Sequence, residues 1–167
     1  MTTYLLDSNI FIQSKNFHYR FEFCQAFWDL IINLHTQGHV FSIKKVKDEL
    51  IAGNDDLSIW IKKLPDSFWI DEFEHIGDYQ KVMTWAYAAD FTDKAKEVFA
   101  EAKIADAWLV ASAASHANRV IVTQEARVDS NMKRQIKIPN AAQHFQVTCL
   151  TLYDFLSATC HNNFTPI

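Results

Sequence analysis

Short apolar runs recur along the chain, and each is ended by polar residues. Runs of this length that are rich in leucine, isoleucine and valine are typical of strands buried on both faces. The runs predicted as strands are TYLL (3–6), HVFSI (39–43), RVIVT (119–123) and VTCL (147–150), with FWI (68–70) as a further candidate. The pattern therefore predicts a sheet of four or five strands.

Between these runs, apolar residues recur at intervals of three and four, the spacing that places them on one face of a helix. In residues 20–37 this stripe begins at Phe23 and ends at Leu34, and Gly38 follows as a stop. Further helices are predicted over residues 44–53, 55–64, 76–89, 92–101, 104–114 and 151–158, with a short one that begins near Pro139.

Apolar strands that alternate with helices are typical of a parallel sheet covered on both faces. We therefore predict the α/β class, as a three-layer α/β/α domain with a mostly parallel sheet. The 167 residues suit one domain, 1–167. Its largely helical segment at about 53–103 is predicted to be an insertion or side lobe.

Composition limits the compartment and the partners. The three cysteines are widely spaced without a C-x-x-C pair, which favours a reducing, cytoplasmic setting over a disulfide framework or zinc ribbon. No apolar run approaches the ~20 residues of a membrane span, and the first residues do not resemble a signal peptide, so no membrane partner is expected. A formal charge of −4 argues against a protein that binds nucleic acid through its whole surface, although a local basic patch is compatible with this charge.

Acidic residues lie near the ends of several predicted strands. Asp7 ends the first strand, Glu49 lies on the helix after the second, Glu125 follows RVIVT, and Asp106 opens the helix before it. Ligands of parallel sheets bind beyond the carboxyl ends of the strands. Carboxylates gathered there must take up protons or share cations, and Mg²⁺ and Mn²⁺ prefer such oxygen ligands. The order of the acids therefore suggests a metal-dependent phosphoryl-transfer site.

Four stretches together resemble the motifs of PIN-domain ribonucleases. YLLDSNIFI resembles the opening strand that ends in Asp, KVKDELIAG the helix with Glu before Leu, KIADAWLVASAA the Asp before an alanine-rich helix, and VIVTQE the strand that runs into Thr-x-acid. Their order and intervals agree with the family over most of the chain. The nearest subgroup is the VapC-like toxins of prokaryotic toxin–antitoxin pairs, in a longer branch with a KIPN-type segment, here residues 137–140.

This resemblance implies a metal-dependent endoribonuclease that uses Mg²⁺ or Mn²⁺. It implies that Asp7, Glu49 and Asp106 bind the metal and that Glu125 takes a fourth acidic position, which is usually Asp in the family. Asp129 is an alternative for that fourth position. Side chains that resemble supporting groups beside the metal ligands are those of Ser8, Asn9 and Thr123.

The resemblance also implies an RNA substrate, a small antitoxin protein as partner, and a homodimer. Two groups of basic residues flank the acids and are candidates to contact RNA phosphates. These residues are Lys44, Lys45, Lys47, Lys133, Arg134 and Lys137. Phe21, Trp28 and Ile32 lie off the main stripe of the helix predicted at 20–37, which makes them candidates for a dimer or antitoxin surface.

Each assignment has a structural alternative. Asp7 with Ser8 and Asn9 is also good helix-capping sequence. Glu49 can lie on a solvated helix face, Glu125 can lie in a surface loop, and the basic residues can be ordinary solvated charge. Asp106 is harder to explain structurally because its neighbours are predicted to be buried.

Two other functions remain open. A PIN-like fold that binds RNA or protein without catalysis is compatible with Glu125 in place of Asp and with the acidic charge. A phosphatase of the haloacid-dehalogenase type also opens with a strand and an Asp, but it needs a second acid two residues on, where this chain has Asn9. Metal titration discriminates an enzyme from an inactive module, which should not show carboxylate-dependent Mn²⁺ binding.

Overall fold

The sheet is parallel, and its central strand is the first in the chain. The computed structural model describes residues 1–101, 103–125 and 127–167. Within these ranges the main sheet has the order β3-β2-β1-β4-β5, and every neighbouring pair is parallel. Its strands are β1 (Thr3–Leu6), β2 (Val40–Ile43), β3 (Trp69–Ile70), β4 (Arg119–Val122) and β5 (Cys149–Leu150). The predicted parallel sheet is confirmed.

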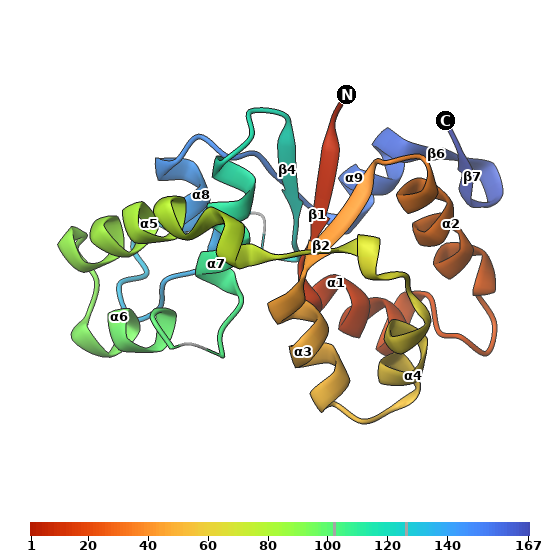
Figure 1. Ribbon diagram of the computed structural model, residues 1–167, viewed down its shortest axis with the longest axis horizontal. Coiled ribbons are helices and arrows are strands. Elements are labelled where there is room, and N and C mark those ends of the chain that lie inside the picture. Colours follow the sequence, from red (N-terminus) through yellow and green to blue (C-terminus); the bar gives the residue numbers. More distant parts are fainter. Residues whose placement is uncertain (102, 126) are drawn as a thin grey trace.

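Helices cover both faces of this sheet, which confirms the three-layer α/β/α arrangement (Figure 1). They are α1 (Ser8–Gln13), α2 (Gln25–Thr36), α3 (Lys44–Ala52), α4 (Asp56–Lys63), α5 (Ile76–Ala88), α6 (Asp93–Phe99), α7 (Asp106–Ala114), α8 (Ile138–His144) and α9 (Leu152–Thr159). On one side α7 contacts β4 and β2 and also α5 and α8, whereas α2 contacts β2 from the other side.

The strands are short and apolar because they lie between the two helical layers. Leu5 and Leu6 of β1, and Ile121 and Val122 of β4, have no exposed surface. The facing helix α7 is rich in buried alanines, whose small side chains allow close approach to the sheet. Burial on both faces therefore explains why the strands read as continuous apolar runs rather than as alternating patterns.

Helix α2 begins later than the apolar stripe over 20–37 predicts. It starts at Gln25, because the residues from Arg20 to Cys24 form a turn that is closed by the Cys24 amide donating to the Arg20 carbonyl at 2.9 Å. Phe23, which was assigned to the buried stripe, is 66% exposed. The first part of that prediction is wrong.

An aromatic cluster contains two residues, Phe21 and Trp28, that were candidates for a partner surface. Phe21 stacks on Trp28 with ring centroids 4.3 Å apart. Trp28 has no exposed surface, and its indole N–H donates to the carbonyl of Tyr19 at 2.7 Å. Trp28 therefore belongs to the interior of this chain and Phe21 is partly buried against it, whereas Ile32 is 39% exposed.

The ends of α2 and α3 differ in which residue adopts the left-handed backbone conformation. Gly38 follows α2 with φ 81°, a conformation that glycine adopts without steric cost, so the predicted stop is confirmed. Gly53 after α3 has an ordinary φ of −64°, and the left-handed position is taken by Asn54 with φ 50°. Asparagine is the second-best residue for that conformation.

The segment 53–103 contains α4, α5 and α6, but it also supplies β3 to the edge of the sheet. Asp55 begins α4 by accepting a hydrogen bond from the Ser58 amide at 3.1 Å. Thr92 begins α6 in the same way, through the Ala95 amide at 3.3 Å. This segment is therefore partly integrated into the sheet rather than wholly helical.

A small hairpin follows α9 that the sequence pattern did not predict. Strands β6 (Cys160–His161) and β7 (Thr165–Pro166) pair in antiparallel fashion, and their joining turn contains Asn163 with φ 55°. Across the described parts of the chain, no helix combines the length and the apolar character that a membrane crossing requires.

The strand order creates a natural ligand-binding edge. β1 lies between β2 and β4, so the chain passes to opposite sides of β1 in its successive crossovers. The connections that leave the carboxyl ends of these strands consequently diverge, and a crevice opens between them.

Candidate active site

Asp7 lies directly after β1 and is only 4% exposed. It occupies the position before α1, yet its side chain makes no capping bond with that helix. Instead, its Oδ2 accepts a hydrogen bond from Thr123 Oγ1 at 2.9 Å, and its Oδ1 lies 3.4 Å from Ser8 Oγ. The carboxylate is therefore directed toward the end of β4, and helix capping does not explain its presence.

Thr123 joins the ends of β1 and β4 through one hydroxyl. Its Oγ1 accepts from Asn9 Nδ2 and from the Glu125 amide, both at 3.2 Å. Because a hydroxyl carries a single proton, these two incoming donors leave that proton for Asp7. The other end of the Asn9 amide accepts from the Gln124 backbone at 3.1 Å.

This network explains why Asn rather than an acid stands at position 9. An ionised carboxylate has no proton to donate to Thr123, whereas the amide both donates and accepts. The acid that a haloacid-dehalogenase phosphatase needs two residues after its first Asp is therefore absent. Asn9 stands there instead and donates to the Thr123 hydroxyl, which in turn donates to Asp7.

Glu49 reaches the same edge from α3. Ser8 Oγ donates to Glu49 Oε1 at 3.1 Å, which is shorter than its 3.4 Å approach to Asp7. The single hydroxyl proton therefore serves Glu49 better than Asp7. Glu49 itself is exposed, so it lies at the mouth of the crevice rather than in its floor.

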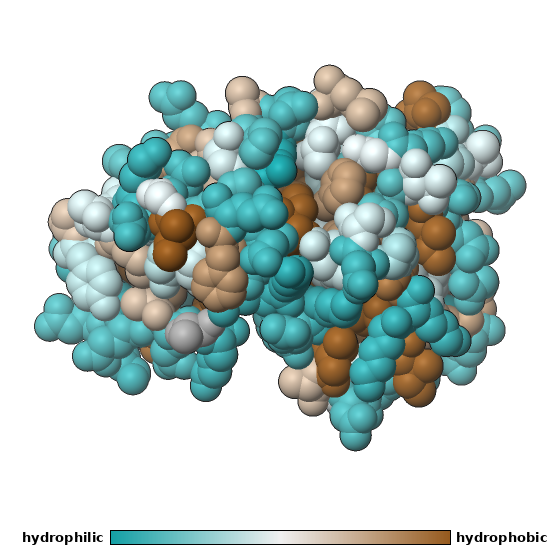
Figure 2. All heavy atoms as spheres, viewed as in Figure 1, coloured by the Kyte–Doolittle hydropathy of each residue, from teal (hydrophilic) through white to brown (hydrophobic). Residues whose placement is uncertain are grey.

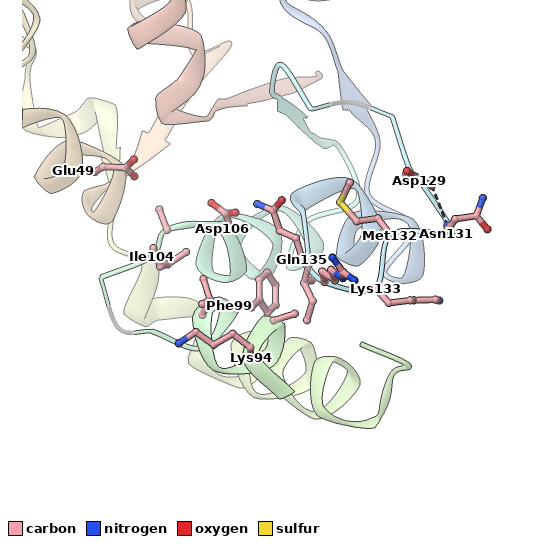
Figure 3. Close-up of a pocket in the computed structure, with 15 residues that line it drawn as sticks. Glu49, Lys94, Phe99, Ile104, Asp106, Asp129, Asn131, Met132, Lys133 and Gln135 are labelled. Carbon is pink, nitrogen blue, oxygen red and sulfur yellow. Dashed lines mark hydrogen bonds between the residues drawn. The ribbon is translucent and has the colours of Figure 1, made fainter. Parts of the chain in front are cut away.

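Asp106 opens α7 and is partly buried opposite Glu49 (Figure 3). Burial, together with the nearby Glu125 and Glu49 carboxylates, raises the pKa of Asp106 to about 6. Burial also raises the pKa of Asp7 to about 7, with a contribution from the Asp106 charge that the Thr123 hydrogen bond opposes. Acids from four separate segments therefore converge closely enough to repel one another.

Glu125, rather than Asp129, is the fourth acid near this cluster. Glu125 contributes to the raised pKa of Asp106, whereas Asp129 is not among the causes. Asp129 lies at the opposite end of the pocket from Glu49 and accepts a hydrogen bond from the amide of Asn131 in its own loop, at 3.0 Å (Figure 3). Its place does not suit it to replace Glu125.

A pocket of about 810 Å³ opens beside these acids. Its polar walls come from Glu49, Asp106, Lys94, Asp129, Asn131, Lys133, Arg134 and Gln135. Apolar side chains such as Phe99 and Ile104 form part of its lining. The molecular surface is indented between the α3 side and the α6–α7 side, and polar residues border the indentation (Figure 2).

The candidate RNA-binding residues separate into two places. Lys133 and Arg134 line the pocket that contains Asp106. Lys44 and Lys47 instead border a different hollow, and they pair with Asp71 at 2.7 Å and with Asp66 at 3.4 Å respectively.

The two remaining lysines of this set have partners of their own. Lys45 lies over the rings of Phe73 and Trp108, 5.6 and 5.8 Å from their centroids. Lys137 pairs with Glu125, with Nζ 3.2 Å from Oε1. It is therefore held beside the acids of the site.

The donor chemistry of this cluster fits a hard divalent cation, because it consists of carboxylates whose mutual repulsion a cation would relieve. The arrangement is open: in the described part of the chain, no group of three or more His, Cys, Asp or Glu side chains stands ready to hold a metal ion. Mg²⁺ commonly binds through one or two carboxylates and keeps several water ligands, which such an open arrangement allows.

Sequence reasoning missed several pocket residues, among them Lys94 and Gln135. Lys94 lies on α6, which was predicted to belong to a side lobe, and no motif marks either residue. Their place depends on how α6 and the 127–136 segment fold back on α7, and no local pattern in the sequence encodes that packing.

Comparison with known proteins identifies one family. No curated protein and no solved structure matches the chain. One family matches residues 4–162 and thus covers all four predicted motifs and every acid of the cluster. The chain therefore belongs to the family described as domain of unknown function (DUF4411).

Proposed function

We propose that this protein is a Mg²⁺- or Mn²⁺-dependent endoribonuclease of the PIN type, which hydrolyses phosphodiester bonds in RNA. The observation that carries the proposal is the buried Asp7 carboxylate, oriented by Thr123, with acids from three other chain segments close by. A buried acid with a raised pKa is costly for stability, and such groups cluster at functional sites.

The residues of this chain have separable roles in the proposed reaction. Asp7 and Asp106 would hold the cation, with Glu49 and Glu125 at the margin of the site. When bound, the ion would polarise a water molecule and stabilise charge on the phosphoryl oxygens. Thr123 and Ser8 orient two of the carboxylates through hydrogen bonds.

Basic residues that line the pocket support a polyanionic substrate. Lys94, Lys133 and Arg134 line the same pocket as Glu49 and Asp106. A cleft that combines carboxylates with cations along its walls is suited to a strand whose phosphates must approach the carboxylates. Lys44 and Lys47 are weaker candidates for such contacts because they border another hollow.

The proposal includes a biological role as the toxin of a toxin–antitoxin pair. A toxin of a toxin–antitoxin pair would act in the cytoplasm, form homodimers and be held inactive by a small antitoxin protein. Large apolar side chains outside the core, such as Phe17 at 61% and Phe23 at 66% exposed, support a protein partner. A short reading frame beside the gene and growth arrest on expression, absent for Asp7→Asn, would test this part.

One observation favours a second candidate, a PIN-like module that binds RNA or protein without catalysis. The Lys137–Glu125 pair neutralises the fourth acid, and this partly replaces a cation with a side chain. An inactive module would retain the fold and the basic wall without carboxylate-dependent metal binding.

The deciding experiment follows cleavage of a fluorescein-labelled single-stranded RNA by the purified protein. Wild type should cleave it with Mn²⁺ or Mg²⁺ and should stop in EDTA. Asp106→Asn should reduce cleavage to background while thermal unfolding shows an intact fold. It should also abolish the rise in melting temperature that Mn²⁺ gives wild type.

Asp129→Asn provides the matched control, because Asp129 lines the same pocket but lies away from the acidic cluster. This variant should cleave RNA like wild type. Equal activity of Asp106→Asn and Asp129→Asn would contradict the site assignment. Absence of both cleavage and a Mn²⁺ shift in wild type would favour the inactive module.

A further inference from the structure

A second hollow adjoins the pocket that contains the acids. It has a volume of about 410 Å³ and shares Met132 and Lys133 with the first pocket. These two residues lie at the end of the first pocket opposite Glu49 (Figure 3). The two cavities therefore follow one another along the surface, with the 132–133 segment between them.

This segment is held in place by the backbone. The Thr92 amide donates to the Lys133 carbonyl at 2.9 Å, and Thr92 also begins α6, which forms one wall of the first pocket. The ammonium of Lys133 lies 5.6 Å from the centroid of Phe91 and 3.8 Å from the Asp90 carboxylate. The positively charged side chain of Lys133 therefore lies at the boundary between the two cavities.

Three aromatic rings, those of Trp85, Phe91 and His144, line the second hollow. Trp85 of α5 and His144 of α8 stack with ring centroids 5.4 Å apart and planes inclined by 25°. Phe91 packs edge-on to Trp85 with centroids 6.0 Å apart. His144 is exposed, so its ring is available to stack with a ligand.

The same hollow offers hydrogen-bonding side chains beside these rings. Asn140 and Gln143 lie on α8 and line it. Asn140 Oδ1 accepts from the Lys137 backbone amide at 2.9 Å, so Asn140 offers its NH2 group as a donor. The Gln143 amide carries both a donor and an acceptor, which match the mixed edges of nucleobases. Flat rings, amides and a nearby cation are the combination by which proteins bind unpaired bases of single-stranded RNA.

Charge gives a reason for such a site here. The chain has a formal charge of −4, and its cleft gathers several carboxylates, so phosphate contacts alone would attract RNA weakly. Base stacking adds affinity that does not depend on net charge.

We propose that the hollow between α5, α8 and the 128–133 segment binds an unpaired nucleobase of the RNA strand whose backbone lies in the acidic pocket. This inference rests on the proposed ribonuclease function and specifies its substrate as single-stranded. The base stacks on the face of His144 that Trp85 does not cover, and the side chains of Gln143 and Asn140, the latter through its NH2 group, contact its edge. Lys133 contacts the phosphate that connects this nucleotide to the strand in the first pocket.

The test measures binding in EDTA, where the strand stays intact. A fluorescein-labelled single-stranded RNA and copies with one abasic nucleotide at a time are titrated with protein, and fluorescence anisotropy reports the Kd. One abasic position should weaken wild-type binding roughly five- to hundredfold, the range for loss of one base–aromatic stack. His144→Ala should weaken binding of the intact strand by a similar factor and should be insensitive to that abasic position.

His161→Ala is the matched control, since His161 is also exposed but lies on β6. It should retain wild-type affinity and abasic sensitivity, and Gln143→Ala should weaken binding of the intact strand less than His144→Ala. Equal binding of intact and abasic strands by wild type, or equal affinities of the two histidine variants, would overturn the base site. If wild type still cleaves RNA in that case, the proposed function survives the loss of this inference. A protein that neither binds nor cleaves RNA would overturn both.

Discussion

Thr123 Oγ1 donates a 2.9 Å hydrogen bond to Asp7 Oδ2 across 116 residues of sequence. This bond joins the ends of two neighbouring strands and lowers the pKa of a carboxyl group that burial raises. It therefore keeps part of the Asp7 population ionised near neutral pH and fixes the direction of the carboxylate.

Replacing Thr123 with valine keeps the shape of the side chain and removes the donor. Without this bond the pKa of Asp7 should rise further, so the pH at which RNA cleavage reaches half its maximum should move upward. Cleavage near neutral pH should fall by about 10- to 100-fold, the usual cost of losing a residue that orients a metal ligand. Thr123→Ser restores the hydroxyl and should recover most of the activity. Identical pH–rate profiles for valine and wild type would contradict this role.

The buried Asp7 also predicts how stability depends on pH when metal is absent. Because its pKa is raised from 3.8 to about 7, the folded state binds the proton more tightly than the unfolded state. The stability that Asp7 gains from binding its proton is therefore fully present below about pH 4, and this part of the free energy of unfolding is lost as the pH rises through 7. Asp7→Asn cannot ionise, so in EDTA at high pH it should be more stable than wild type by up to ~4 kcal/mol.

Urea unfolding at acidic and alkaline pH measures this difference. The excess in free energy of unfolding of Asp7→Asn over wild type should shrink toward acidic pH. Asp129→Asn, at an exposed position, should give no comparable excess. Saturating Mn²⁺ should stabilise wild type but not Asp7→Asn at alkaline pH. A constant difference between Asp7→Asn and wild type across the pH range would exclude ionisation of Asp7 as its cause.

Removing Lys137 should strengthen cation binding. Lys137→Gln takes away a positive charge 3.2 Å from Glu125, so the Mn²⁺ concentration for half-maximal thermal shift should fall several-fold. Both partners are about one-third exposed, so the free energy of unfolding should change by less than ~1 kcal/mol. Lys94→Gln is the control, since Lys94 lines the pocket but pairs with Glu97. Equal Mn²⁺ midpoints for the two variants would place Glu125 outside the cation site.

Trp28 predicts a stability effect independent of the acids. Trp28→Phe removes the donor to the Tyr19 carbonyl and leaves a cavity in a fully buried cluster. The free energy of unfolding should fall by about 2–4 kcal/mol, as measured by urea unfolding. Trp60→Phe, at a partly exposed ring of the same cluster, should cost less. RNA cleavage below the unfolding range should be unchanged in both variants.

Sequence reasoning succeeded where one physical signal was dominant. β1 and β4 are buried on both faces, so their composition alone marks them as strands. Asp7 and Asp106 each stand directly at the boundary of an element that the pattern identifies, so their positions in the fold could be predicted. Thr92 and Asp55 were found as helix starts because their side chains cap through purely local bonds.

It failed where packing between distant segments decided the outcome. Phe23 continues an apolar stripe, yet Phe21 stacks on Trp28 and the helix begins after both Phe21 and Phe23. The side chains of Lys44 and Lys47 pair with acids of the β3 region, which no spacing rule relates to them. The choice between Glu125 and Asp129 likewise depended on the course of a loop.

The central place of β1 has a consequence for protein synthesis. Among the strands of this domain, β1 is the first to leave the ribosome, but its ladder with β4 requires residues 119–122. Asp7 meets its Thr123 partner only after that ladder can form. A nascent chain would therefore carry Asp7 without the partner that orients it until Thr123 has been synthesised. Under the proposed function, this order of assembly would keep the incomplete protein from cleaving the RNA that encodes it.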